Sequence, residues 1–238
     1  MATRGLVQAV KDLTEVVRLS GAPIKDPFRY EVHLPGSHNP DLPEGSRAVY
    51  AFLCGDTSLK VGKVGLRSAA RFEYQHYQGG AQSTLHASLT TEVMALRLSA
   101  RGVQIDRVLT EEGEAVYRAP HAEVRPTVPN LDRTSPEKDR PNLDRSLISV
   151  SAAAIKHVHD RVFAESPFEP HDLARLDERF GIGDRRAAPV QTVEQWIRGR
   201  TERIDIFVPA ALGPAMASLV EAFLHARWSP RYEGRTRI

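Results

Sequence analysis

Apolar positions at helical spacing mark both ends of the chain. In residues 5–19 (GLVQAVKDLTEVVRL) the apolar side chains recur every third or fourth residue, which predicts an amphipathic helix. Residues 214–228 (PAMASLVEAFLHARW) show the same spacing and predict a second amphipathic helix, which Pro230 ends. We expect its buried face to consist of Met216, Leu219, Val220, Phe223 and Leu224.

Compact apolar runs bounded by turn residues predict strands between these helices. RAVYAFL (47–53) and LKVGKVG (59–65) lie on either side of the turn-forming CGDTS, which is typical of a β-hairpin. RIDIFVP (203–209) predicts a third strand, which its proline closes. Residues 21–46 are rich in Pro and Gly, and we interpret them as a linker.

Shorter helical patterns follow the hairpin and precede the third strand. SAARFEYQHY (68–77) predicts a helix that the glycine pair at 79–80 ends. The next predicted helix runs to Gly102, where a glycine can adopt the left-handed conformation that closes a helix. TVEQWIRGR (192–200) predicts one more short helix.

Residues 103–189 differ from the rest of the chain in composition. The pentapeptide PNLDR occurs at 129–133 and again at 141–145, around a spacer rich in Pro and charge. Such a composition buries little apolar surface and favours extended chain. Within it, 150–164 and 170–181 have helical patterns, and we interpret the whole segment as an insertion.

These patterns predict one discontinuous core. Residues 47–102 and 190–238 supply its two parts, 1–46 form an N-terminal helix and linker, and 103–189 are inserted between the parts. The chain has 238 residues, of which 41% are hydrophobic, so it is long and apolar enough to bury such a core.

Charge and cysteine content bear on partners and compartment. The formal net charge of +2 permits a local basic patch but does not by itself indicate a nucleic-acid partner. Cys54 is the only cysteine, so no internal disulfide forms, which suits a reducing compartment. The first residues lack a secretory pattern, and no apolar run approaches the ~20 residues of a membrane helix. We expect a cytoplasmic chain that makes no membrane contact.

Positive residues concentrate where the second strand of the hairpin passes into the following helix. Gly62 and Gly65 in this stretch would let a phosphate approach the backbone at a helix N-terminus. The spacing matches neither a phosphate loop nor a dinucleotide fingerprint. An anion site and a solvated basic helix face therefore both remain open for the cluster, which consists of Lys60, Lys63, Arg67, Arg71 and His76.

Three other features have both a chemical and a structural interpretation. Glu221 is a lone carboxylate among apolar and small residues, so it is either a metal ligand or a surface residue. His157 and His159 lack the partners of a zinc site, which favours a surface helix. Cys54 lies at a turn without a histidine partner, and we do not expect a nucleophile there.

The hairpin resembles that of the GIY-YIG nuclease family. AVY (48–50) stands where the family has Gly-Ile-Tyr on its first strand, and KVG (60–62) stands where it has Tyr-Ile-Gly on its second. Lys60 thus replaces the second tyrosine, as in a restriction-enzyme branch of the family. The resemblance covers about residues 47–100 and 190–234.

The later motifs of the family follow in the same order. Arg71 and His76 are similar to the family's Arg and His on the next helix, and Glu221 in VEAFLHARWSPRYEG is similar to the Glu of a later helix. The Asn that often follows this Glu is not evident, and Glu233 lies near its place.

The resemblance implies a fold and an activity. The fold would be α+β, with a small three-stranded antiparallel sheet flanked by helices, an N-terminal helix and a long insertion. The activity would be metal-dependent hydrolysis of DNA phosphodiester bonds with Mg²⁺ or Mn²⁺, in defence or mobile-element biology, with RNA as the alternative substrate. A catalytically inactive nucleic-acid-binding or assembly module on the same fold remains open, as does a protein partner bound through residues 1–46 or 103–189.

The resemblance also assigns roles to the metal ligand and the base. Glu221 would bind the metal, which stabilises the leaving oxygen. Tyr50 would act as general base, and Lys60 on the paired strand would lower its pKa by favouring the phenolate.

The remaining candidates would act on the phosphate. Arg71 would hold the scissile phosphate with its planar fork, and His76 would position water or share protons with Tyr50. Lys63 and Arg67 would contact backbone phosphates. The reaction requires a common cleft of about 10 Å, formed by Tyr50, Lys60, Arg71 and Glu221.

Each assignment has a structural alternative. Tyr50 would be a core residue with a satisfied hydroxyl, and Lys60 an exposed charge on an edge strand. Arg71 would pair with a carboxylate or remain solvated.

Overall fold

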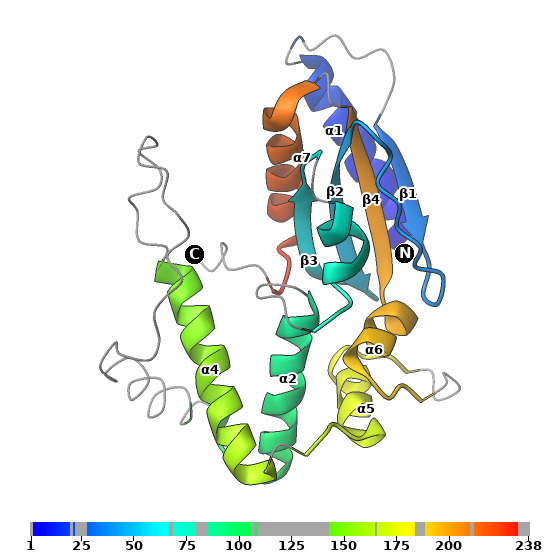
Figure 1. Cartoon of the computed structure of the whole chain (residues 1–238). Helices are drawn as coiled ribbons and strands as arrows, with labels where there is room; N and C mark the ends of the chain where they lie inside the picture. Colours follow the sequence, from blue (N-terminus) through cyan, green and yellow to red (C-terminus); the bar gives the residue numbers. More distant parts are fainter. Residues whose placement is uncertain are drawn as a thin grey trace. The chain divides into compact units, whose positions relative to one another are not determined.

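The structure, a computed structural model, describes most of the chain as two compact units (Figure 1). One unit contains the described residues up to Thr90 and those from Phe168 onward, and the other contains those between Thr91 and Pro167. No helix in the described part is both long and apolar enough to cross a membrane. The described residues are 2–19, 21, 28–66, 69–79, 85–105, 108, 143–164, 166–183, 189–209 and 212–232.

An antiparallel sheet of four strands organises the first unit, in the order β1-β4-β2-β3. The strands are β1 (Arg29–His33), β2 (Ser46–Cys54), β3 (Thr57–Val64) and β4 (Glu202–Pro209). The α+β class is confirmed, and β2 and β3 form the predicted hairpin.

The prediction of three strands is wrong, because β1 lies within the segment that we interpreted as a linker. Its register pairs Arg29 with Phe207 and His33 with Arg203. With five residues, RYEVH, and two charged side chains before its only aliphatic one, this edge strand has no apolar run that a sequence pattern detects.

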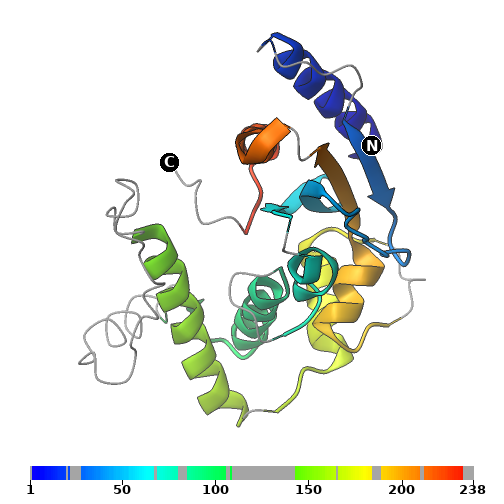
Figure 2. The ribbon, with the colours of Figure 1, turned by 45° about the horizontal axis from the view of Figure 1, so that its top comes forward.

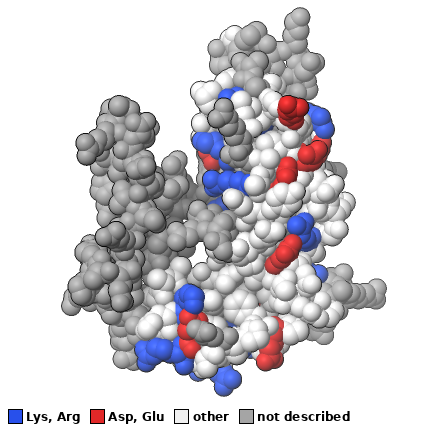
Figure 3. All heavy atoms as spheres, viewed as in Figure 1, with Lys and Arg blue, Asp and Glu red and all other residues white. Residues whose placement is uncertain are grey.

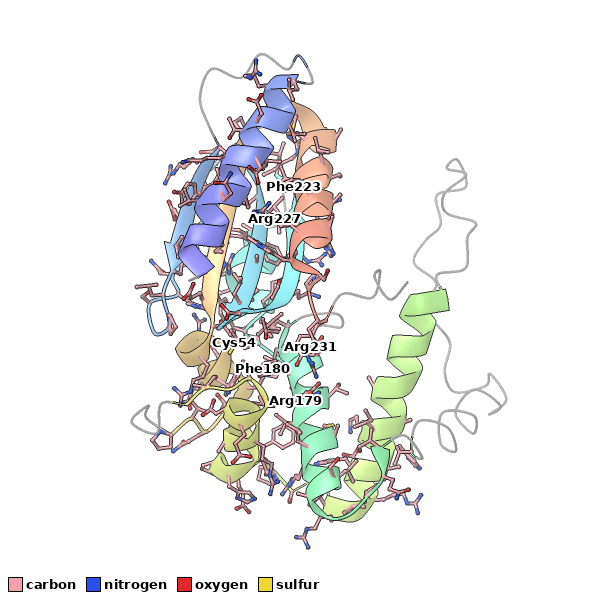
Figure 4. The ribbon with its side chains drawn as sticks, turned by 180° about the vertical axis from the view of Figure 1, so that it is seen from behind. Cys54, Arg179, Phe180, Phe223, Arg227 and Arg231 are labelled. Carbon is pink, nitrogen blue, oxygen red and sulfur yellow. The ribbon has the colours of Figure 1, made fainter. Side chains whose placement is uncertain are left out.

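Alternation along the strands gives the sheet an apolar face. Two helices cover it, α1 (Ala2–Leu19) and α7 (Gly213–Trp228), as Figures 1 and 2 show. Between these helices Arg227 Nη1 donates to Asp12 Oδ2 at 2.9 Å, and Figure 4 shows Arg227 beside Phe223 there. The core cluster on this face includes Ala9, Leu13, Val17, Val49, Ala51, Val61, Ile204, Ile206 and Val220.

The buried stripe of α7 differs from the predicted one. It consists of Ala217, Val220 and Leu224, whereas Leu219, which we expected to be buried, is 40% exposed. Met216 and Phe223 pack at the margin of the cluster. The predicted burial is therefore confirmed for Val220 and Leu224 and wrong for Leu219.

The opposite face of the sheet is aromatic and polar, and η1 (Arg71–Gln75) covers it (Figure 2). Within the predicted helix 68–77, this is a single turn of π-helix. Its Phe72 is fully buried, and the ring centroid lies 6.1 Å from that of Tyr50 in an edge-on contact.

Two short helices pack together in the first unit, α5 (Pro170–Arg179) and α6 (Val193–Arg200). Trp196 Nε1 donates to Asp177 Oδ1 at 2.8 Å, which satisfies the buried indole N–H. Although α5 belongs to the expected insertion, it clusters with the unit that contains the sheet.

The second unit contains α4 (Leu143–Phe163) and most of α2 (Leu85–Ala100), which begins in the first unit. The guanidinium of Arg97 lies 4.1 Å from the ring centre of Phe163 and also donates to Ser166 O at 3.0 Å. Of the two PNLDR copies, the first lies outside the described residues and the second is described only from Leu143.

A substitution at Gly62 of β3 tests how closely Tyr50 of β2 packs against this strand. A Cβ at this position would lie 2.4 Å from Tyr50 Oη, whereas one at Gly65 would meet nothing within 4 Å. We expect Gly62→Ala to lower the free energy of unfolding by about 1–3 kcal/mol through overpacking. Gly65→Ala, the matched control, should leave it unchanged in urea titrations; equal midpoints for the two variants would contradict this packing.

Candidate functional site

Tyr50 and His76 form a closely hydrogen-bonded pair on the aromatic face of the sheet. Tyr50 Oη lies 2.6 Å from His76 Nε2, and both residues are 0% exposed. The backbone N–H of Leu85 donates to His76 Nδ1 at 3.3 Å, so a neutral ring carries its proton on Nε2. His76 therefore donates to the phenol oxygen of Tyr50.

The surroundings keep His76 uncharged. Burial lowers its pKa well below the ordinary value, because a charged ring would lose its hydration. Positive charges lower the pKa further, and they belong to Lys60, Arg203 and Arg71. At neutral pH the imidazole is therefore a neutral donor with a fixed tautomer.

Lys60 lies on the same face as Tyr50. It pairs in register with Phe52, two residues beyond Tyr50, so their side chains share one side of the sheet. Lys60 is only 5% exposed, which is contrary to the alternative of an exposed edge-strand charge. For Tyr50, in contrast, the structure fits the alternative of a core residue, because His76 supplies a hydrogen-bond partner to its buried hydroxyl.

Arg71 is exposed at the start of η1, close enough to His76 to affect its pKa. In an α-helix, side chains five residues apart point in different directions. The i→i+5 hydrogen bonds of a π-helix place them about one turn apart. The π-turn thus reconciles the five-residue spacing of Arg71 and His76 with a common site.

Glu221 does not lie with these residues. Its Oε2 is 2.8 Å from Lys63 Nζ, which also donates to Ser218 Oγ at 2.9 Å. Lys63 pairs in register with Val49, so this ion pair lies on the face that α7 covers. The expectation that Glu221 shares one cleft with Tyr50 is therefore wrong, because strand alternation directs Lys60 and Lys63 to opposite faces.

Lys63 and Arg67 are the two residues that we expected to contact backbone phosphates. Lys63 is half-exposed, and its ammonium is held by Glu221 and Ser218 instead of projecting freely towards a phosphate. Arg67 lies outside the described residues.

Glu221 is the carboxylate that could hold a metal here. Across the described residues no group of three His, Cys, Asp or Glu side chains could hold an ion by itself. Mg²⁺ nevertheless binds in many phosphate-processing sites through one or two carboxylates, with water and substrate phosphate as its other ligands. The 22% exposed carboxylate of Glu221 fits that open arrangement, with Lys63 as the competing cation.

A buried ionic network lies beside the Tyr50–His76 pair, and none of the sequence motifs includes its residues. Arg203 Nε donates to Asp205 Oδ1 at 2.8 Å, and both side chains are 0% exposed. His33 Nε2 lies 3.0 Å from Asp205 Oδ2. The signal was present in RIDIF, where opposite charges two residues apart interrupt an apolar strand and so share one face.

His38 joins the network from the segment that follows β1. Its Nε2 donates to Thr201 O at 2.7 Å, which leaves Nδ1 to accept from Tyr77 Oη at 3.1 Å. Burial lowers the pKa of His38 from 6.5 to about 4, with smaller contributions from neighbouring charges.

The chain after α7 folds back onto the edge strand. Ser229 has a left-handed φ of 42° and ends the helix, and the following Pro230 is buried. Arg231 N then donates to Ser58 O, and Tyr232 N to Leu59 O, both at 2.9 Å. Figure 4 shows Arg231 near Phe180, whose ring centre is 5.7 Å from the guanidinium. The segment from Pro230 to Tyr232 thus covers the edge of β3 just before Lys60.

The sequence analysis also considered Cys54, His157 and His159 as candidates for chemistry. Burial raises the pKa of the Cys54 thiol to about 12, which agrees with the absence of a nucleophilic role. His157 is exposed as expected, but His159 is buried, with its ring 4.8 Å from that of Phe163.

Surface charge is mixed. Figure 3 shows Lys and Arg side chains interspersed with Asp and Glu over the face viewed in Figure 1. In the second unit, the guanidiniums of Arg97 and Arg101 lie 4.1 and 5.7 Å from the ring centre of Phe163.

Comparison with known proteins identifies no relative. No family model, no curated protein and no solved structure matches the chain. Its function therefore has to be argued from the site and from the motifs.

The buried His38 predicts acid sensitivity. Its pKa is about 4 in the folded chain and near 6.5 in the unfolded chain, so the unfolded chain binds more protons between these values. The stability present above pH 6.5, about 3 kcal/mol for this group, is lost as the pH falls towards 4.

The measurement is urea unfolding from pH 7 to pH 4. His38→Gln keeps a donor to Thr201 O and should flatten the pH dependence, whereas His157→Gln, a change at an exposed histidine, should not. Parallel profiles for wild type and His38→Gln would show that His38 is not the group responsible.

Proposed function

We propose that the chain is a metal-dependent endonuclease of the GIY-YIG type that hydrolyses DNA phosphodiester bonds. The observation that supports this most is the 2.6 Å hydrogen bond between Tyr50 and a neutral His76, with Lys60 and Arg71 nearby. Hydrolysis of a phosphodiester requires a proton acceptor and positive charge around the phosphate, and this arrangement offers both.

Tyr50 is the proton acceptor in this proposal. The proton on His76 Nε2 points at the phenol oxygen, so it stabilises negative charge there. Lys60 adds a positive charge on the same face. Once the phenol has released its proton to solvent, the phenolate takes the proton of the attacking water, while exposed Arg71 binds the phosphate oxygens.

Glu221 is the residue that would hold Mg²⁺ or Mn²⁺. When bound, the metal supplies stabilisation of the charge that develops on the leaving oxygen. In the chain without substrate, Lys63 Nζ lies 2.8 Å from Glu221 Oε2. For Glu221 to bind the metal, Lys63 therefore has to leave this carboxylate and contact a substrate phosphate instead. Gly62 and Lys63 are adjacent on the edge strand, which brings Tyr50 and Glu221 to two sides of the same short segment.

A second function is favoured by the same contacts. Tyr50 and His76 are fully buried, and Glu221 is paired on the other face of the sheet. These features suit a module that binds DNA or RNA without cutting it. For a protein partner, residues 103–189 are the better candidate, because the apolar face of α1 in 1–46 is already used by the core.

Cleavage of supercoiled plasmid with Mg²⁺ or Mn²⁺ tests the nuclease proposal. We expect nicking or linearisation that EDTA abolishes. Tyr50→Phe and Glu221→Ala should each lower the rate by about 100-fold or more, because they remove the base and the metal ligand. Tyr74→Phe, a change at a 52% exposed tyrosine of η1, is the matched control and should cut at the wild-type rate.

If wild type and Glu221→Ala are equally inactive with either metal, on duplex and single-stranded DNA, the endonuclease proposal fails. Binding without cleavage would then support the second function.

The Lys63–Glu221 pair predicts a change in binding that does not depend on cleavage. Glu221→Gln removes the charge that holds Lys63, so in EDTA it should tighten DNA binding and steepen its salt dependence by about one phosphate contact. Lys63→Gln alone and the double variant should both bind no more tightly than wild type. Fluorescence anisotropy at several salt concentrations measures this; equal slopes for all four proteins would show that Lys63 makes no phosphate contact.

A further inference from the structure

We propose that Arg203, a residue without a motif assignment, is the positioning residue that fixes η1, and with it Arg71 and His76, on the sheet. Its contribution to catalysis rests on the nuclease function proposed above. Its structural role rests on the contacts described next.

Arg203 contacts Phe72 near the start of η1 and Tyr77, the residue after its C-cap His76. Its Nη1 donates to the backbone oxygen of Phe72 at 2.7 Å and to Tyr77 Oη at 3.1 Å. Phe72 directly follows Arg71, and Tyr77 directly follows His76. Arg203 Nη1 therefore binds the residue that follows Arg71 and the residue that follows His76.

The guanidinium is itself rigidly held. Its Nε donates to Asp205 Oδ1, and the second oxygen of that carboxylate contacts His33. The ring centres of Phe72, Phe52 and Tyr50 lie 4.3, 5.3 and 5.6 Å from its central carbon. A planar guanidinium can stack among rings and donate in its own plane at the same time, which a lysine cannot do.

The η1 turn has few other means of reaching the sheet. It is one π-turn, which is too short to be stable alone. Phe72 supplies its buried apolar anchor, and the His76–Tyr50 bond supplies a polar one. Because Arg203 extends from β4 between these anchors, it decides where the turn lies relative to Tyr50.

Arg203 also contributes to the charge that His76 experiences. The groups facing His76 come from four elements: Lys60 on β3, Arg203 on β4, Arg71 on η1 and Tyr50 on β2. Asp205 lies behind Arg203 and offsets part of its charge. A change of charge at position 203 therefore alters the pKa of His76. Loss of the hydrogen bonds made by Arg203 instead loosens η1 on the sheet.

Two variants separate these contributions. Arg203→Lys keeps the charge beside Asp205 but loses the fork that reaches Phe72 O and Tyr77. Arg203→Met combined with Asp205→Asn removes both charges together, so neither is left buried without its partner. Val220→Ala, on the opposite face of the sheet, is the control for general loss of stability.

Hydrogen–deuterium exchange of peptides spanning residues 69–79 is the first measurement, made on the full chain. Arg203→Lys should exchange there on the order of tenfold faster than wild type, since the bonds holding the turn are lost. Val220→Ala should show no selective increase in that segment. Unchanged exchange in Arg203→Lys, or an equal increase in Val220→Ala, would overturn the positioning role.

NMR titration of the His76 ring is the second measurement, assigned by comparison with His76→Gln. The pKa should stay low in Arg203→Lys and rise in the charge-free double variant, because a positive charge near the ring is then removed. A pKa that is the same in wild type and the double variant would overturn the electrostatic contribution. Neither readout depends on cleavage, so inactivity of the wild type would refute the nuclease function and leave this inference to be decided separately.

Discussion

The buried ion pair of Arg203 and Asp205 is the interaction on which the site depends. Both side chains are fully buried on an inner strand of the sheet, where removing one partner costs about 3–5 kcal/mol. Most of the remaining polar groups around the pair find a partner, although Arg203 Nη2 is buried without a hydrogen-bond partner among the described residues. Those partners are the His33 ring of β1, the backbone of η1 and the Tyr77 hydroxyl, so the pair joins an edge strand and the π-turn to the sheet.

Strand alternation is the second constraint, and it places the proposed catalytic residues on opposite faces of the sheet. Lys60 and Lys63 are three residues apart on β3 and so project to opposite faces of the sheet. One joins the aromatic face with Tyr50, and the other pairs with Glu221 on the helical face. Any common action on one phosphodiester therefore has to occur around this edge strand, where Gly62 leaves the backbone without a side chain.

Sequence patterns were reliable where a segment has a strong period of its own. The amphipathic helix at 5–19, the hairpin and the strand at 203–209 all formed close to their expected bounds. The pattern failed for β1, since a short edge strand with charged side chains has no apolar run. It also failed for Leu219, because α7 turns Ala217, Val220 and Leu224 towards the core and leaves Leu219 40% exposed.

The sequence by itself determined the order of the elements, the hairpin that carries Tyr50 and Lys60, and the residue types available for phosphate chemistry. Only the tertiary structure decided which of them meet. It joined His76 to Tyr50 through a π-turn, directed Glu221 to Lys63, and brought Arg203 beneath η1. The physical reason is that strand pairing and helix docking bring together residues far apart in the chain, and no local period specifies which faces will be opposed.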